Sequence, residues 1–426
     1  MRPLSSARKG FLAIAGASGA AQLVGLAGMP VISRLFSPEE FGPFAVVNAA
    51  VLPAAALASL RLELAIPLPD EGQARALVSL GLRASAWFGL VGTVIAGLVV
   101  TGAGAWTDDG WWSLLPWVPV VAGLMGAFAV LNQYAVRHRA YGAIGRRNVL
   151  MAVAVVSLQV TAGLLDAGPH GLAAGLAGGQ LVGVLSLRHS LRGQLRAVSA
   201  PTRAERAATL GSHRTYPLLM APAGVVNVLG LTAPLLLVAA IFGQTVSGWL
   251  GMTQRVLTLP VALLGLALAQ VYLGEFSAAR REGGRDLERL FLRTSMRLGL
   301  AALAMVLVVG LASPIAFPLV LGEQWERSGT YGVALAAAMG VQMVASPLSQ
   351  TVIVMGYPAL QAMWDVLRLV ACGGAVLVSH RLGLEDVATV GVLGGTMCLT
   401  YVLSWLLSFW AVRSGPRARD VTSEST

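Results

Sequence analysis

Four ionisable side chains lie inside or at the edges of long apolar runs, where a charged group is energetically unfavourable. Arg34 ends the first run, Arg61 and Glu63 follow the second, and Arg255 lies within a later one. An uncompensated charge inside a membrane segment costs about 2.5–3.5 kcal/mol, so such residues commonly face a cavity or a partner. Because guanidinium groups bind phosphates well, these cations predict a site for an anionic group such as a pyrophosphate.

Two further pairs of polar residues could take part in the same binding. Asp365 and Arg368 are three residues apart in an apolar run, which places them on one face of a helix. Asn48 and Gln254 are amides inside other runs and could bind sugar hydroxyls.

Each candidate residue also has a structural alternative that the sequence leaves open. Arg255 can bond to the free carbonyls of a kinked helix, and Arg34 can extend to lipid headgroups. The oppositely charged pairs Arg61/Glu63 and Asp365/Arg368 can each neutralise themselves. The amides of Asn48 and Gln254 can hold neighbouring helices together.

The sequence contains no recognisable constellation for catalysis. Its five histidines fall in loops or at the ends of apolar runs, and it lacks HExxH, GxSxG and phosphate-binding GKS/T patterns. We therefore predict no catalytic residue, no metal ion and no cofactor. The net charge of +10 does not indicate nucleic acid, because the cations cluster between apolar runs instead of forming a basic patch with aromatic residues.

The composition is that of a membrane protein. Of 426 residues, 56% are hydrophobic and only 12% are charged, about half the charge of a soluble protein. Runs of about 20 apolar residues cross the hydrocarbon core as helices. We predict twelve such spans, at about 11–33, 41–60, 76–101, 112–136, 148–165, 171–187, 216–242, 248–273, 298–318, 331–355, 359–379 and 387–412.

The distribution of basic residues predicts the orientation. Counting alternate connections places 25 of the 30 Lys and Arg residues on one side of the membrane. Only Arg34, Arg327 and Arg381 fall on the other side, and Arg255 and Arg368 lie within spans. Cytoplasmic loops are enriched in Lys and Arg, so both termini are predicted to be cytoplasmic.

A long polar connection divides the chain into halves of six spans. We predict an N-terminal six-helix bundle at 1–189, a cytoplasmic linker at 190–215, a C-terminal bundle at 216–412 and a cytoplasmic tail at 413–426. The halves echo each other, because Gly42, Phe44 and Asn48 match Gly248, Leu250 and Gln254 at a constant offset. Parallel repeats of this kind place a transport pathway between them.

Several motifs, in order, resemble the bacterial oligosaccharide flippases (Wzx-type polysaccharide biosynthesis proteins) of the multidrug/oligosaccharidyl-lipid/polysaccharide exporter (MOP) superfamily. The segments that show the resemblance are SRLFSPEEFG at 33–42, RLELAIPLP at 61–69, QRVLTLPVALLGLALAQVY at 254–272, GEQWERSG at 322–329 and SPLSQTVIVMG at 346–356.

The resemblance implies an all-α integral membrane protein of about twelve transmembrane helices, in two six-helix bundles around a central cavity. It also implies alternating access that moves a polyprenyl-pyrophosphate-linked oligosaccharide from the inner to the outer leaflet. The expected partners are this substrate, membrane lipid, and glycosyltransferases and a polymerase of the same pathway. Arg34, Arg61, Glu63 and Arg255 fall in the matching motifs.

Two other functions compete with the flippase at this stage. A cation-coupled small-molecule antiporter of the same superfamily would need buried carboxylates in the N-terminal half, and none lies deep in a predicted span. A membrane-embedded polysaccharide synthase would need a sizeable aqueous loop with catalytic groups, which is missing, while a scaffold component would be recognised by its association with glycosyltransferases.

Overall fold

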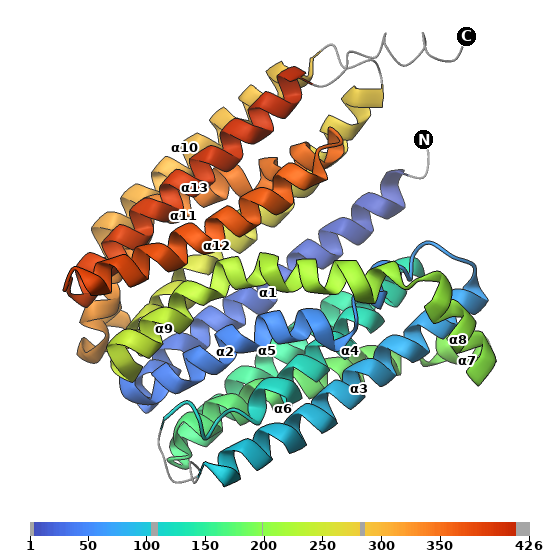
Figure 1. Ribbon diagram of the computed structural model, residues 1–426, viewed down its shortest axis with the longest axis horizontal. Coiled ribbons are helices and arrows are strands. Elements are labelled where there is room, and N and C mark those ends of the chain that lie inside the picture. Colours follow the sequence, from blue (N-terminus) through green and yellow to red (C-terminus); the bar gives the residue numbers. More distant parts are fainter. Residues whose placement is uncertain (1–3, 104–109, 198, 282–285, 415–426) are drawn as a thin grey trace. The chain divides into compact units, whose positions relative to one another are not determined.

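The computed structural model describes residues 4–103, 110–197, 199–281 and 286–414, and in these residues it is helical, without strands (Figure 1). The chain forms two compact units, Met1–Gly251 and Met252–Thr426. The division between units thus falls within a helix and not in the polar connection at 190–215, so the predicted bundle boundaries remain a prediction.

The first unit is built around α4. It contains α1 (Leu4–Leu35), α2 (Pro38–Ala58), η1 (Leu62–Leu64), α3 (Glu71–Gly102), α4 (Trp117–Arg137), α5 (Tyr141–Leu164), α6 (Gly168–Ser190), α7 (Arg192–Ala197), α8 (Arg203–Ser212), η3 (Tyr216–Met220) and the beginning of α9 (Ala221–Arg281). Helix α4 packs against α2, α3 and α6, while α5 packs between α1 and α6. Tyr134 of α4 is fully buried in a hydrophobic side-chain cluster of this unit.

The second unit is built around α11. It contains the remainder of α9, then α10 (Leu287–Ala316), η4 (Phe317–Leu321), η5 (Glu323–Trp325), α11 (Glu326–Val354), α12 (Pro358–Arg381) and α13 (Asp386–Ser414). Helix α11 packs closely against α10 and α13, and α13 also contacts α12. The Thr253 hydroxyl of α9 donates to the Ser328 carbonyl, 2.9 Å away, which ties α9 to α11.

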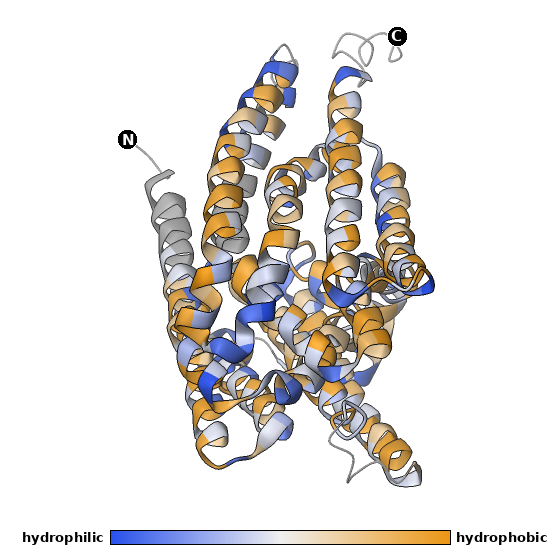
Figure 2. Ribbon diagram, turned by 90° about the vertical axis from the view of Figure 1, so that its left-hand side faces the viewer, coloured by the Kyte–Doolittle hydropathy of each residue, from blue (hydrophilic) through white to orange (hydrophobic). Residues whose placement is uncertain are grey.

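Ten helical segments of the described residues are long and apolar enough to cross a membrane. In one of them, α9, Gly243 adopts φ 84°, which breaks it into two helices. With α1 and with the two parts of α9 counted separately, the ten become the twelve predicted spans. Figure 2 shows the apolar residues along the helices, with hydrophilic residues mainly near helix ends. The predicted all-α, multi-pass membrane fold is confirmed.

Helix boundaries follow the local chemistry of the sequence. The motif at 33–42 is a helix stop and start, because Ser37 caps α2 by accepting from the Glu40 amide while the Glu40 carboxylate accepts from the Ser37 amide. Pro38 takes the first helical position, where a missing amide costs nothing. A Gly356 residue with φ 94° similarly precedes α12, which begins at Pro358.

Two glycines bring α2 and α9 into unusually close contact within the first unit. A Cβ atom at Gly42 would overlap the Gln244 carbonyl oxygen, and one at Gly248 would overlap the Pro38 carbonyl oxygen. Gly42 and Gly248 are the pair that the internal repeat matches, and the same offset relates Pro38 to Gln244. Equivalent residues therefore make reciprocal contacts, as expected where a two-fold axis passes through a helix crossing.

Candidate functional site

The connection after α2 holds Arg61 in a conformation that side chains rarely adopt. Leu60 and Arg61 both have φ 55°, in the left-handed region, although neither is glycine. Non-glycine residues in this region are held there by their surroundings and cluster at functional sites. The short helix η1 follows at once, and its Leu62 is fully buried in the core of the first unit.

The carboxylate of Glu63 is fixed beside Arg61. It is only 7% exposed, accepts a 2.7 Å hydrogen bond from the Ser59 hydroxyl, and lies 3.7 Å from an Arg61 guanidinium nitrogen. Arg61 is 27% exposed, and its guanidinium makes no hydrogen bond to another residue in the described part of the chain. The carboxylate thus places the cation while leaving its N–H donors open to an anion.

A glycine of α9 makes room for the guanidinium. A Cβ atom at Gly224 would lie 2.5 Å from one Arg61 nitrogen, so the side chain lies directly on the helix backbone. Just before this point the chain makes a π-helical turn, η3, which contacts η1. Such π turns are frequent at functional sites. Arg61 is therefore positioned between its own strained turn and the start of α9.

A second ionic cluster holds the connection after η1 in place. The Glu71 carboxylate accepts hydrogen bonds from the Tyr134 hydroxyl at 2.7 Å and from Arg137 Nε at 3.0 Å. It also lies 3.1 Å from His138 Nε2. Arg137 in turn donates to the Ile66 carbonyl at 3.0 Å, which joins α4 to the segment that carries Arg61 and Glu63.

The structure separates Arg34 and Asn48 from Arg61. Arg34 is exposed at the end of α1, where it donates to the Pro30 carbonyl at 3.3 Å. Helix α2 has 21 residues and is about 31 Å long, so Arg34, just before it, and Arg61, just after it, lie near opposite ends of α2. Asn48 is exposed midway along α2.

The candidates of the second unit lie on two helices. Gln254 and Arg255 are half-buried in α9, in the part of this helix that belongs to the second unit. Asp365 and Arg368 are both buried in α12, with 3.5 Å between carboxylate oxygen and guanidinium nitrogen. Arg368 also lies 4.5 Å from the ring of Trp364. The predicted i, i+3 proximity is thus present.

A buried cation that the sequence predicts to lie outside the membrane spans is enclosed in the first unit. The predicted span at 148–165 begins after Arg147, but α5 begins at Tyr141 and Arg147 is only 4% exposed. Its guanidinium donates to Gln180 at 3.0 Å and to Asn148 at 3.1 Å, and it lies 3.3 Å from the ring centre of Phe128.

No carboxylate of the described residues pairs with Arg147, and its buried Nε has no hydrogen-bond partner there. A Cβ at Gly183 would meet that Nε at 2.8 Å, so the glycine provides the space for the guanidinium. The sequence signal that could have identified it is the polar and small pair Gln180 and Gly183 on one face of α6.

No group of three or more His, Cys, Asp or Glu residues that could hold a metal ion occurs in the part of the chain that the structure describes. Cys372 and Cys398 are free thiols.

Comparison with family models identifies the family of the chain, and comparison with solved structures shows its fold. The model of a family described as "Polysaccharide biosynthesis protein" matches residues 31–329. No curated protein matches this chain.

Solved structures are similar along almost the whole length. The lipid II flippase MurJ, in an inward closed conformation, superposes with a TM-score of 0.71 and 12% identity, covering 95% of this chain and 88% of MurJ. A MOP superfamily transporter from Pyrococcus furiosus gives 0.62 at 16% identity, with 95% and 96% covered. A MATE in complex with MaL6 gives 0.64 at 16%, with 95% of each chain covered.

Proposed function

We propose, from the premise that the chain belongs to the polysaccharide biosynthesis protein family, that it is a flippase for a polyprenyl-pyrophosphate-linked oligosaccharide. As a multi-pass membrane protein with the fold of MOP transporters, it moves this substrate from the cytoplasmic to the outer leaflet of the bacterial inner membrane by alternating access. The oligosaccharide then enters surface polysaccharide. Glycosyltransferases and a polymerase of that pathway are its proposed partners.

The geometry of Arg61 is the observation that supports this substrate best. Its guanidinium is partly exposed, it has N–H donors free for a ligand, and Glu63 and Gly224 fix its position. A planar guanidinium donates to phosphate oxygens in a fork geometry, so Arg61 suits the pyrophosphate of a lipid carrier. Glu63 opposes excess positive charge and keeps an anion from binding too tightly to be released.

The remaining candidates extend the proposed pathway. With both termini cytoplasmic, Arg61 lies at the cytoplasmic end of α2, where substrate enters, and Arg34 lies at the outer end of α1. The proposed route runs between bundles at 1–189 and 216–412, with Asn48, Gln254, Arg255, Asp365 and Arg368 as further substrate contacts.

The test combines a gene deletion with a matched pair of variants. Deletion should abolish surface polysaccharide and leave lipid-linked oligosaccharide on the cytoplasmic face. Arg61→Gln should not restore export, because a bidentate contact to pyrophosphate is lost. Arg83→Gln, which removes an exposed cation from α3 in the same region of the chain, should restore it fully.

Both variants need comparable abundance in the membrane for the comparison to hold. Intact surface polysaccharide in the deletion strain, with no accumulated intermediate, would refute the flippase. Full export by Arg61→Gln would refute the role of Arg61 while leaving the flippase intact.

A further inference from the structure

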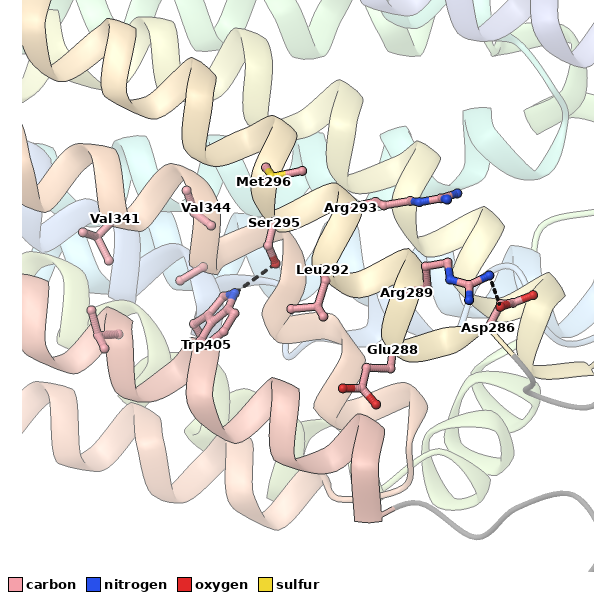
Figure 3. Close-up of a pocket in the computed structure, with 12 residues that line it drawn as sticks. Asp286, Glu288, Arg289, Leu292, Arg293, Ser295, Met296, Val341, Val344 and Trp405 are labelled. Carbon is pink, nitrogen blue, oxygen red and sulfur yellow. Dashed lines mark hydrogen bonds and ion pairs between the residues drawn. The ribbon is translucent and has the colours of Figure 1, made fainter.

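A groove in the second unit is lined along one side by α10 and along the other by α11 and α13. Its volume is about 930 Å³, within the 300–1,000 Å³ typical of ligand sites. Figure 3 shows its charged residues gathered at one end and its apolar residues continuing away from them. The apolar lining consists of Leu292, Met296, Val341, Val344, Ala345, Val402 and Trp405.

The apolar part of the groove continues from its charged end. Leu292 and Met296 are four residues apart on α10, which places them one above the other on the same face of the helix. Met296 is 75% exposed in the second unit, so the wall of the groove presents apolar surface. The indole N–H of Trp405 donates to the Ser295 hydroxyl at 3.0 Å, which uses the only donor of the indole ring.

The charges at the mouth leave one cation uncompensated. Asp286 pairs with Arg289 at 3.2 Å, and Glu288 accepts from Arg413 at 3.0 Å. Both acidic residues of the lining are therefore occupied. Arg293 has no ion pair or hydrogen bond with another residue of the described chain. In Figure 3 its side chain extends toward the same end of the groove as Arg289.

We propose that this groove binds a diacyl phospholipid with an anionic headgroup. The phosphate lies at Arg293, and an acyl chain follows Leu292 and Met296 into the groove. A basic residue at a membrane surface strengthens the binding of an anionic lipid about fivefold. With both termini cytoplasmic, the connection between the predicted spans 248–273 and 298–318 is also cytoplasmic, and the basic end of the groove belongs to it, so the lipid comes from the inner leaflet.

Native mass spectrometry of the purified, delipidated protein tests the headgroup contact. The probes are phosphatidylglycerol and the zwitterionic phosphatidylcholine, each added over a concentration series. Wild type should bind phosphatidylglycerol more tightly, and Arg293→Gln should lose about fivefold of that affinity without a change for phosphatidylcholine. The matched control is Arg297→Gln, one turn further along α10 and outside the groove, which should bind as wild type does.

A second pair of variants tests the acyl-chain contact. Val344→Trp should fill the groove and weaken both lipids, whereas Leu303→Trp, on an exposed face of α10, should weaken neither. Equal affinity of wild type for the two lipids, or equal loss in Arg293→Gln and Arg297→Gln, would overturn the proposal. Protein that dimerises in detergent and loses dimers only in Val344→Trp would assign the groove to a second copy and also overturn it. These readouts do not depend on oligosaccharide transport.

Discussion

Replacing Gly42 by alanine should destabilise the crossing of α2 and α9 by about 1–2 kcal/mol. The added Cβ would overlap a backbone carbonyl oxygen of Gln244, which cannot rotate away as a side chain could. To restore ordinary contact the two backbones must separate by about 1 Å or more. Overpacking of this kind costs about 1–3 kcal/mol, and the better helix propensity of alanine returns up to about 1 kcal/mol.

The reciprocal geometry gives the prediction a second, sharper signature. Gly248→Ala should cost about as much as Gly42→Ala, because its Cβ would meet the Pro38 carbonyl in the equivalent way. Once either alanine has separated the backbones, the other has room. The double variant should therefore cost clearly less than the sum of the single variants.

Thermal unfolding of the purified variants in detergent provides the assay. Gly97→Ala in α3 and Gly310→Ala in α10 are the matched controls, since neither glycine has an atom within 4 Å of an added Cβ. Both controls should be as stable as wild type or slightly more so. If Gly42→Ala unfolds at the same temperature as Gly97→Ala, the close crossing is absent from the folded protein. Additive losses in the double variant would show that the two glycines do not share one contact.

Three further predictions address buried charges and a surface cap. Asp365→Asn should destabilise the second unit by about 2–4 kcal/mol, because the buried charge of Arg368 then loses the carboxylate of Asp365. Thermal unfolding measures the loss, and the double variant Asp365→Asn/Arg368→Gln should recover part of it. Arg147→Met should leave the stability unchanged or raise it, because the substitution removes a buried cation that no carboxylate of the described residues neutralises. A large loss of stability in the same unfolding assay would instead indicate a required polar contact. Hydrogen bonds from the Thr202 amide and hydroxyl hold the pKa of Glu205 below its ordinary value. The cap of α8 is therefore stabilising above about pH 4.3 and is lost as pH falls through the lowered pKa. Amide hydrogen exchange in α8 should increase at that pH in wild type, whereas in Glu205→Gln it should follow only the intrinsic exchange rate.

The sequence predicted most of the helices because a span is a local property. Length and hydrophobicity within one segment decide whether it crosses a membrane, and capping residues such as Ser37 and Gly356 decide where it ends. The break in α9 was predicted between 242 and 248, and it occurs at Gly243. Boundaries shifted where a helix continues past the apolar run, as at the start of α5.

Internal symmetry was visible in the sequence only as a weak echo. The match of Gly42 to Gly248 is a spacing between two segments and contains no information on whether they touch. In the folded chain both glycines lie at one helix crossing, and each leaves the space that the other helix needs to approach. The sequence shows that both positions lack a side chain, but it does not show that the two positions pack together.

By itself, the sequence determined the class of the protein, its helices and the adjacent pairs Arg61/Glu63 and Asp365/Arg368, because each of these depends on residues close together in the chain. Only the tertiary structure decided which cations are buried and what they meet. Arg147 looks like any loop arginine until α4, α5 and α6 enclose it, and Arg61 acquires its position from Gly224, more than 160 residues away. The physical reason is that the energy of a charge depends on everything around it, and its surroundings are assembled by packing between distant segments.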